Sequence, residues 1–133
     1  DMQVLVNPVN TVGVMSKGLA KQFKKRFPAM FTEYKIACDN GSLAIGKLHL
    51  IRTDDKWVMN FPTKAHWRAK SKIKYIETGL KQFVEIYEEE QIESIALPML
   101  GCGFGGLDWD LQVKPVMEDY LSNLDIQIEI YVN

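Results

Sequence analysis

The segment Leu97-Pro-Met-Leu-Gly-Cys-Gly-Phe-Gly-Gly-Leu-Asp-Trp109 places four glycines within six positions. It follows the apolar run Ser94 to Leu97, which predicts a buried strand, and it precedes a helical pattern. Glycine at this density weakens any packed helix or strand, so the loop needs another reason to exist. A cradle of closely approaching backbone N–H groups around a diphosphate is such a reason. The segment therefore predicts a strand–loop–helix unit that binds an anion.

A second glycine-bearing loop lies near the start of the chain. Val4-Leu-Val-Asn-Pro-Val-Asn-Thr-Val-Gly-Val-Met-Ser-Lys-Gly18 carries Asn7 and Asn10 where we expect a strand to end, the place where α/β folds present ligand contacts. Gly13 and Gly18 bracket a turn before a helix, whose N-terminus attracts anions. The alternative is an ordinary strand-to-helix turn, in which Asn and Gly only satisfy backbone geometry. Two such loops in one small domain favour a nucleotide-type ligand held from both sides.

Hydrophobic periodicity predicts alternating strands and helices. The expected strands are Gln3 to Val6, Lys47 to Arg52, Trp57 to Phe61, Ser94 to Leu97, and Ile126 to Val132. The expected helices are Lys17 to Phe27, a segment from Pro28 to about Asn40-Gly41, Ile73 to Tyr87, and a last helix from about Asp110 through Leu121. This order predicts one layered α/β domain, spanning residues 1–133, with a largely parallel sheet.

Composition sets the class of protein. The 133 residues are 47% hydrophobic and 25% charged, as expected for one domain with a full core. A formal net charge of −1 predicts no polyanion partner by itself. No apolar run approaches the roughly 20 residues of a membrane span, and no signal peptide appears. Cys38 and Cys102 do not resemble a secreted disulfide framework, so we expect reduced thiols and a cytoplasmic location. His49 and His66 form no recognisable metal set, and we expect no metal.

Charge is unevenly distributed along the chain. Ten of the sixteen cationic residues lie in two stretches: Lys17, Lys21, Lys24, Lys25 and Arg26, and then Lys64, Arg68, Lys70, Lys72 and Lys74. The second stretch also contains His66 and Trp67, whereas acidic residues gather elsewhere, notably between Glu85 and Glu93. Basic residues with an interleaved aromatic suit single-stranded nucleic acid. The alternative is a solvated helix face.

At the two glycine loops the chain resembles a macro domain, a family of ADP-ribose-binding proteins, over Val4 to Val132. Asn60-Phe-Pro-Thr-Lys-Ala-His-Trp-Arg68 resembles a narrower branch, the DNA ADP-ribosyl glycohydrolase antitoxins of the DarT–DarG type. The resemblance implies a three-layer α/β/α fold with a central mixed, largely parallel sheet. It also implies removal of ADP-ribose from a nucleobase in DNA, which reverses the action of a cognate ADP-ribosyltransferase toxin. No cofactor and no membrane contact are implied.

The resemblance also implies roles for individual residues. Lys64 matches the lysine on which hydrolysis in this branch depends, and Asn10 would contact the distal ribose. The remaining ADP-ribose contacts would come from Pro8, Val9, Thr11, Gly13, Val14, Met15, Lys17, Gly18, Thr63, Gly101, Cys102, Gly103, Phe104, Gly105, Gly106 and Leu107. We expect Trp67, Arg68, Lys70 and Lys72 to contact single-stranded DNA.

The chain departs from the family pattern at several points. Ser16 stands where a glycine is usual, and Gly105 stands where a glutamate-specific relative has a catalytic Asp, so a lysine–aspartate mechanism is not expected. The helix start Asp108-Trp-Asp-Leu-Gln-Val-Lys-Pro is one residue longer than is typical. The family's first strand, with the acidic residue that reads adenine, would precede Asp1.

The residues leave several chemistries open. Lys64 could donate a proton to the leaving group or, if deprotonated, attack the anomeric carbon; it could also be only a surface cation near a phosphate. Cys102 is a less favoured nucleophile. One rival function is a non-catalytic ADP-ribose reader, against which Lys64 and its Asn60-Phe-Pro-Thr context argue. Another is a hydrolase of protein-linked ADP-ribose or of its phosphate ester, and Gly105 weakens its glutamate-specific form.

Overall fold

The computed structural model describes residues 2–131 and contains a five-stranded sheet with the strand order β2-β3-β1-β4-β5. The strands are β1 (Val4–Asn10), β2 (His49–Arg52), β3 (Trp57–Lys64), β4 (Ser94–Leu97) and β5 (Gln127–Ile130). Strand β1 pairs in parallel with β3 and β4, β4 pairs in parallel with β5, and only β2 runs antiparallel, along β3. The predicted mixed, largely parallel sheet is confirmed.

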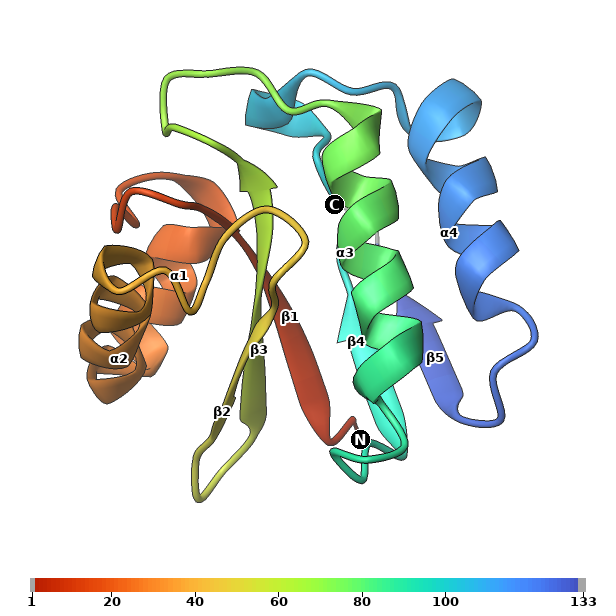
Figure 1. The fold of residues 1–133 in the computed structure, drawn as a ribbon, viewed down its shortest axis with the longest axis horizontal. Coiled ribbons are helices and arrows are strands. Elements are labelled where there is room, and N and C mark those ends of the chain that lie inside the picture. The colour runs from red at the N-terminus through yellow and green to blue at the C-terminus, as the bar shows by residue number, and fades with distance from the viewer. Residues whose placement is uncertain (1, 132–133) are drawn as a thin grey trace.

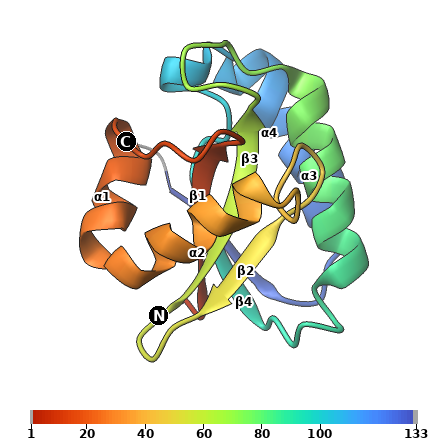
Figure 2. The same ribbon diagram turned by 60° about the vertical axis from the view of Figure 1, so that its left-hand side comes forward.

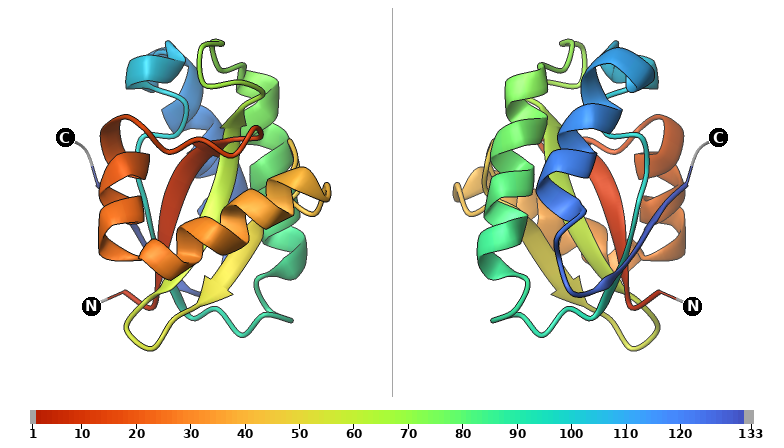
Figure 3. Two further views of the ribbon diagram at one scale, coloured as in Figure 1. Left: turned by 90° about the vertical axis from the view of Figure 1, so that its left-hand side faces the viewer. Right: turned by 90° about the vertical axis from the view of Figure 1, so that its right-hand side faces the viewer.

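Helices cover both faces of the sheet, which confirms the three-layer arrangement (Figure 1). Helices α1 (Gly18–Arg26) and α2 (Pro28–Asp39) lie on one face, and α3 (Ile73–Ile86) and α4 (Lys114–Leu121) lie on the other (Figure 2). The loops that leave β1, β3 and β4 gather at one edge of the sheet (Figure 3). No helix among residues 2–131 has both the length and the apolar composition that crossing a membrane requires.

The side chains of β1 alternate between the two faces of the sheet and pack in two separate hydrophobic cores. Val4 and Val6 belong to the core beneath α3 and α4, whereas Val9 belongs to the core beneath α1 and α2. Asn7 lies on the same side as Val9 and is fully buried. Its Nδ2 donates a hydrogen bond to Oδ1 of Asn60 on β3, 3.0 Å away. This side-chain hydrogen bond joins β1 and β3 at the one paired position where both strands place an asparagine, rather than an apolar residue, on that face.

The two central strands are longer than predicted. Strand β1 continues past Val6 to Asn10, and β3 continues past Phe61 to Lys64, so Asn7 lies inside a strand and Lys64 is not on a following turn. The β1–β3 pairing is regular until Val9 lies opposite Pro62; Asn10 then pairs with Lys64, because a bulge skips one residue. Proline cannot donate to a ladder and is tolerated at such bulges.

The predicted last helix begins later than expected. Residues Trp109–Val113 form a single π-helical turn, and α4 begins only at Lys114 rather than near Asp110. The N–H of Val113 donates to the carbonyl of Asp108, and the Asp108 carboxylate accepts from the N–H of Leu111 at 2.8 Å. A π turn holds one more residue than an α turn. The unusually long helix start is therefore accommodated by this turn.

The other boundaries differ by a few residues. Strand β2 begins at His49 rather than Lys47, because Lys47 closes a local turn with Ala44 through an isolated bridge. Helix α3 ends at Ile86, one residue before the predicted end. The predicted end of the last strand, Val132, lies outside the described residues.

Close packing between α3 and β3 generates a stability prediction. A β-carbon on the buried Gly79 of α3 would lie 2.3 Å from Cζ of Phe61, which is itself fully buried on β3. We expect Gly79→Ala to lower the free energy of unfolding by about 1–2 kcal/mol, since overpacking of this kind outweighs the helix propensity that alanine gains. Urea unfolding would measure it. The exposed Lys81→Ala on the same helix should change stability by less than about 0.5 kcal/mol, and equal effects would contradict the packing argument.

Candidate functional site

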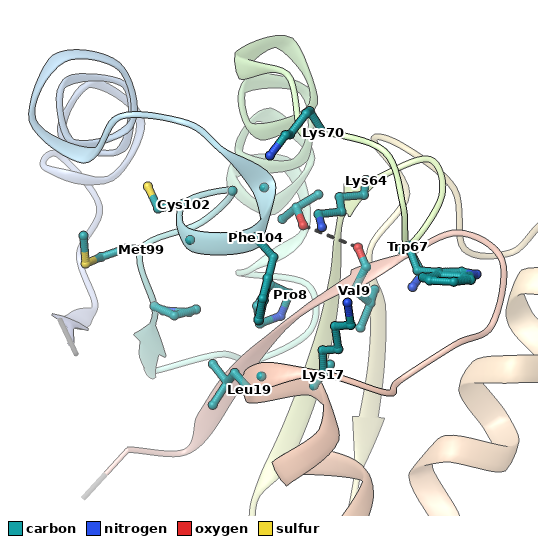
Figure 4. A pocket seen from close by; sticks show the side chains of 18 of the residues that line it. Pro8, Val9, Lys17, Leu19, Lys64, Trp67, Lys70, Met99, Cys102 and Phe104 are labelled. Atoms are coloured by element: carbon teal, nitrogen blue, oxygen red, sulfur yellow. Dashed lines mark hydrogen bonds between the residues drawn. The ribbon is translucent and has the colours of Figure 1, made fainter.

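The carboxyl ends of β1, β3 and β4 surround a cavity of about 760 Å³. Because these three strands are parallel, the segments that follow them meet at one edge of the sheet. The volume lies in the range of small-molecule sites. Figure 4 shows side chains from these segments converging on the cavity, with Phe104 and Pro8 near its middle.

Most of the predicted site residues line this cavity. From the first loop they are Pro8, Val9, Asn10, Val14, Lys17 and Gly18, and from β3 and its loop they are Thr63, Lys64, Trp67, Arg68 and Lys70. The glycine loop contributes Gly101, Cys102, Gly103, Phe104 and Gly105. No Asp or Glu is among the lining residues in the described part of the chain. The cavity is therefore lined by four cationic side chains and suits an anionic ligand.

Six predicted residues lie outside the lining, each for a structural reason. Met15 is buried in the core beneath α1 and α2, and Leu107 packs against the opposite core. Gly13 lies against Lys35, and Gly106 lies against Lys70. Two polar residues have other partners, as Thr11 Oγ1 donates to the carbonyl of Ala65 and Lys72 is the N-cap of α3 with its Nζ above the ring of Tyr75.

The glycine loop combines unusual backbone angles with free donors. Gly101, Gly103 and Gly106 have φ of +75°, +68° and +83°, a region that residues with a β-carbon rarely adopt. Several of the loop's N–H groups bond within the loop, including those of Cys102, Gly105, Gly106 and Leu107. The N–H groups of Gly103 and Phe104 begin the short helix η1 (Gly103–Gly105) and, as at any helix start, have no intrahelical acceptor. They are the donors this loop can offer an anion.

Asn10 holds the first loop together. Its Oδ1 accepts hydrogen bonds from the N–H groups of Val12 and Val14 at 3.1 and 3.3 Å, and its Nδ2 donates to the carbonyl of Val14 at 2.8 Å. Tyr34 on α2 lies directly beneath, and its hydroxyl is 2.8 Å from the Asn10 carbonyl and 2.9 Å from Oδ1. The Asn10 side chain is thus largely committed to the loop, with one Nδ2 hydrogen left for a ligand.

Tyr34 was not expected to matter to the site. It is fully buried, and its burial, with a smaller contribution from Cys38, raises the pKa of its hydroxyl far above the ordinary value. The hydroxyl therefore stays protonated and acts as a donor to Asn10. A helical pattern alone cannot show that a residue 24 positions later reaches the first loop.

Lys64 is the last residue of β3 and lies beside the glycine loop. A side chain at position 105 would begin 3.9 Å from Lys64 Cε, so the lysine side chain passes directly beside Gly105. Partial burial lowers the pKa of Lys64, and the positive charges of Lys70 and Lys17 lower it further. The three lysines come from separate segments and converge on one cavity (Figure 4). The site therefore favours a neutral amine at Lys64 more than water does.

The loop between β3 and α3 is attached to both ligand loops. Its first residue, Ala65, accepts from Thr11 at 2.8 Å, and its Ser71 N–H donates to the carbonyl of Gly105 at 2.9 Å. Between these tethers, the Trp67 ring stacks with His66 at 5.4 Å between centroids, and the Arg68 guanidinium lies 4.4 Å from the Trp67 centroid. A base that stacks on Trp67 must therefore share the ring with these neighbours.

Sequence reasoning missed six lining residues: Ser16, Leu19, Ala20, Pro98, Met99 and Tyr131. Tyr131 follows β5, and its N–H donates to the carbonyl of Leu97. Burial raises the pKa of Tyr131 to about 12. We call Pro98, Met99 and Tyr131, which all line the cavity, the apolar wall. Figure 4 shows Met99 at the end of the cavity away from Trp67. The position of Tyr131, an aromatic residue at the carboxyl end of a predicted parallel strand, was the sequence signal that could have identified it as a site residue.

Cysteine and metal chemistry find little support at the site. Burial raises the pKa of the Cys102 thiol, with a smaller effect from Asp108, and this disfavours the thiolate that a nucleophile requires. Cys38 and Cys102 are both free. Among residues 2–131, no group of three or more His, Cys, Asp or Glu side chains could hold a metal ion.

Comparisons with known proteins agree with this geometry. A family model for the macro domain matches residues 6–116. The chain is 45% identical to a DNA ADP-ribosyl glycohydrolase of Mycobacterium tuberculosis and 41% identical to a DNA ADP-ribosyl transferase–DNA ADP-ribosyl glycohydrolase fusion protein of Thermosipho africanus. Each match covers 98% of this chain but only 38% of the relative, so the chain spans well under half the length of these relatives.

Solved structures give the same picture. The macrodomain of Mycobacterium tuberculosis DarG superposes with a TM-score of 0.94 at 46% identity, covering 98% of this chain and 89% of that one. Thermosipho africanus DarTG in complex with ADP-ribose superposes with a TM-score of 0.95 at 43% identity, covering 99% of this chain and 38% of that one.

The contact between Tyr34 and Asn10 generates a prediction. Tyr34→Phe keeps the buried ring but removes the donor to Asn10, so we expect the free energy of unfolding to fall by about 1–3 kcal/mol. Because the first loop loses its support, affinity for ADP-ribose, the ligand in the Thermosipho africanus DarTG structure, is expected to fall about tenfold in calorimetry, the equivalent of about 1.4 kcal/mol. Ser94→Ala is the matched control, since Ser94 Oγ accepts from the N–H of Gln3 at 2.7 Å at the far end of β4. An equal loss of ADP-ribose affinity in both variants would contradict a local role for Tyr34.

Proposed function

Because this chain belongs to the macro domain family, we propose that it binds ADP-ribose in the cavity and cleaves it from a nucleobase in single-stranded DNA. The observation that carries the proposal is the position of Lys64, a cation with a lowered pKa beside the glycine loop of a cavity lined by no carboxylate. Identities above 40% with named DNA ADP-ribosyl glycohydrolases support the reaction and the substrate class. A cognate DNA ADP-ribosyltransferase would supply the modified DNA, with this chain acting as its antitoxin.

The proposed ligand position follows from the chemistry of the cavity. The diphosphate lies against the N–H groups of Gly103 and Phe104, where Lys17 adds a positive charge. The distal ribose lies at the other end, between Asn10 and Lys64. The adenosine half then extends toward the apolar wall of Pro98, Met99 and Tyr131.

Lys64 is the proposed catalytic residue. Cleavage of an N-glycosidic bond leaves positive charge on the anomeric carbon and negative charge on the departing nitrogen. A protonated Lys64 would donate its proton to that nitrogen while water adds to the anomeric carbon. A neutral Lys64 would itself bond to the anomeric carbon as the bond to the base breaks, the base would take up the proton that the attacking amine loses, and water would then displace the lysine and release ADP-ribose. The lowered pKa supports the neutral form. Gly105 itself supplies no side chain beside Lys64 that could act as a second acid or base.

The acceptor side of the cavity supports DNA over the rival functions. Trp67, Arg68 and Lys70 line the cavity beyond Lys64, and they offer one aromatic ring and two cations. Phosphate groups and a stacked base match this set. Lys72 is exposed at the N-cap of α3, outside the cavity lining, and stays a predicted DNA contact. A pure reader would have no use for a lysine with a lowered pKa at the ribose, and a glutamate-specific hydrolase would need an acid where Gly105 stands.

Removing Lys64 separates an enzyme from a reader. Lys64→Ala should slow release of ADP-ribose from ADP-ribosylated single-stranded DNA by about 100-fold or more, since a positioned acid, base or nucleophile contributes at least this much. Affinity for free ADP-ribose should stay within about tenfold, because the loop contacts remain. Release would be followed by chromatography and affinity by calorimetry, with Lys81→Ala as the control. Equal rates for Lys64→Ala and the wild type would remove its catalytic role, and no release by either would favour the reader.

The lysine cluster predicts a pH dependence. Because Lys70 lowers the pKa of Lys64, Lys70→Gln should raise the pKa of Lys64 toward its ordinary value. If Lys64 acts as a neutral amine, kcat/KM rises with pH up to its pKa; if it acts as a proton donor, kcat/KM falls above its pKa. In both cases Lys70→Gln should move this limb to higher pH, and the direction of the limb identifies the form that acts. A limb that stays in place would show that Lys70 does not act on Lys64.

A further inference from the structure

Helix α1 carries a second set of cations on the other side of the cavity from the β3–α3 loop. Residues 2–32 contain five cations and no Asp or Glu, and all five lie between Lys17 and Arg26. The helix begins at the cavity, where Lys17, Gly18 and Leu19 are lining residues, and runs away from it (Figure 3). Any ligand that extends out of the cavity over α1 therefore meets only positive charge on that helix.

The five cations differ in what they contact. Arg26 forms an ion pair with Asp55 at 2.8 Å, and Lys24 Nζ lies 4.1 Å from the centroid of Phe31. Lys17 Nζ lies 5.7 Å from the centroid of Phe104, above the exposed ring at the cavity. Lys21 and Lys25 are exposed and have neither a carboxylate nor a ring partner within residues 2–131. The α1 cations left for a partner outside the cavity are thus Lys21 and Lys25, while Lys17 faces the ligand in the cavity.

These three lysines are spaced four residues apart. Lys21 and Lys25 lie one above the other on α1, separated by about 6 Å along its axis, and Lys17 directly precedes the helix as its extended N-cap residue. This spacing is close to one nucleotide repeat of an extended single strand. We call Lys17, Lys21 and Lys25 the α1 ridge. It starts inside the cavity with Lys17 and continues over two further turns on the surface.

The opposite side of the cavity has a matching set. Arg68 and Lys70 are exposed and line the cavity, and the acid-free segment around them extends from residue 56 to residue 76. The α1 ridge and the Arg68–Lys70 pair are therefore two basic surfaces, with Lys64 and the cavity between them. A ligand that served only the ADP-ribose pocket would need neither Lys21 nor Lys25, because both lie outside the cavity lining.

We propose that Lys21 and Lys25 of the α1 ridge bind backbone phosphates on one side of the modified nucleotide, while Arg68 and Lys70 bind those on the other side. This inference rests on the proposed function. It makes the preferred substrate a nucleotide inside a single strand rather than at its end, because only an internal nucleotide has phosphates on both sides. A single strand is favoured over a duplex, because the modified base must leave any stack to bring its ribose to Lys64.

Binding of unmodified DNA tests the ridge without any chemistry. We would measure fluorescence anisotropy of a 5′-fluorescein single-stranded oligonucleotide of mixed sequence over a range of salt concentrations. Two lost phosphate contacts in Lys21→Ala/Lys25→Ala should weaken binding and lower the log–log salt slope by about 1.4, since each contact contributes about 0.7 for a single strand. The control Lys47→Ala/Lys81→Ala removes two exposed lysines outside the cavity and both basic surfaces. It should leave the slope unchanged.

Hydrolysis tests the position of the modified nucleotide. Oligonucleotides that carry one ADP-ribosylated base at the centre, at the 5′ end or at the 3′ end would be compared with an ADP-ribosylated mononucleotide. The wild type should show the lowest KM for the central position. Lys21→Ala/Lys25→Ala should raise KM for the central substrate and for one of the two end substrates. It should leave the other end substrate and the mononucleotide within about twofold.

The outcomes separate the two proposals. If Lys21→Ala/Lys25→Ala matches its control in salt slope and in every KM, the α1 ridge is overturned while hydrolysis by the wild type still supports the proposed function. If a duplex of the same sequence shows the same loss, the ridge is a general polyanion surface and the assignment to a single strand is overturned. If the wild type releases no ADP-ribose from any substrate, the proposed function fails, and the salt slope alone decides whether the ridge binds DNA.

Discussion

The parallel pairing of β1 with β3 on one side and with β4 on the other is the constraint on which the rest of the structure depends. Parallel neighbours cannot be joined by a tight turn, so the chain must cross over between them through helices, and these helices form the two outer layers. The same pairing brings the carboxyl ends of all three strands to one edge. The first loop, Lys64 and the glycine loop meet there although Asn10 lies 54 residues before Lys64 and Gly101 lies 37 residues after it. The direction of the strands, rather than any single side chain, therefore determines where the site lies.

The elements of the fold were predictable because each has a strong periodic pattern, whereas the ends of the central strands were not. The run from Asn7 to Asn10 contains a proline and two amides, and such a run normally indicates a loop. It stays in the sheet because the side chain of Asn7 hydrogen-bonds to Asn60 on the neighbouring strand, a residue 53 positions away in sequence. A pattern read along the chain cannot include it. The same limit placed Lys64 on a turn instead of at the end of β3.

The part of the candidate site that the glycine loops form was predictable from the sequence. The contacts from helix α2 that hold the first loop in place were not. Asn10 was expected as a ligand contact, yet the structure commits most of its side chain to the loop and adds Tyr34 beneath it. Nothing in a helix pattern distinguishes Tyr34 from any other core aromatic. The basic run likewise does not reveal that Lys72 is the N-cap of α3, outside the cavity lining, with its Nζ 5.8 Å from the Tyr75 centroid. Charge runs indicate a surface, but only the direction of each side chain shows which members reach a site.

The net charge illustrates the same limit for electrostatics. A formal charge of −1 describes the molecule at long range, but surface charges separated by more than about 8 Å are largely screened at physiological salt. The two acid-free segments, residues 2–32 and 56–76, hold eleven of the sixteen cations and border the cavity, while the acids lie elsewhere in the chain. A polyanion that approaches the acidic regions is repelled, and one that approaches the cavity meets only cations from its lining. Local segregation of charge therefore directs an anionic chain to the cavity, which a uniform distribution of the same residues would not do.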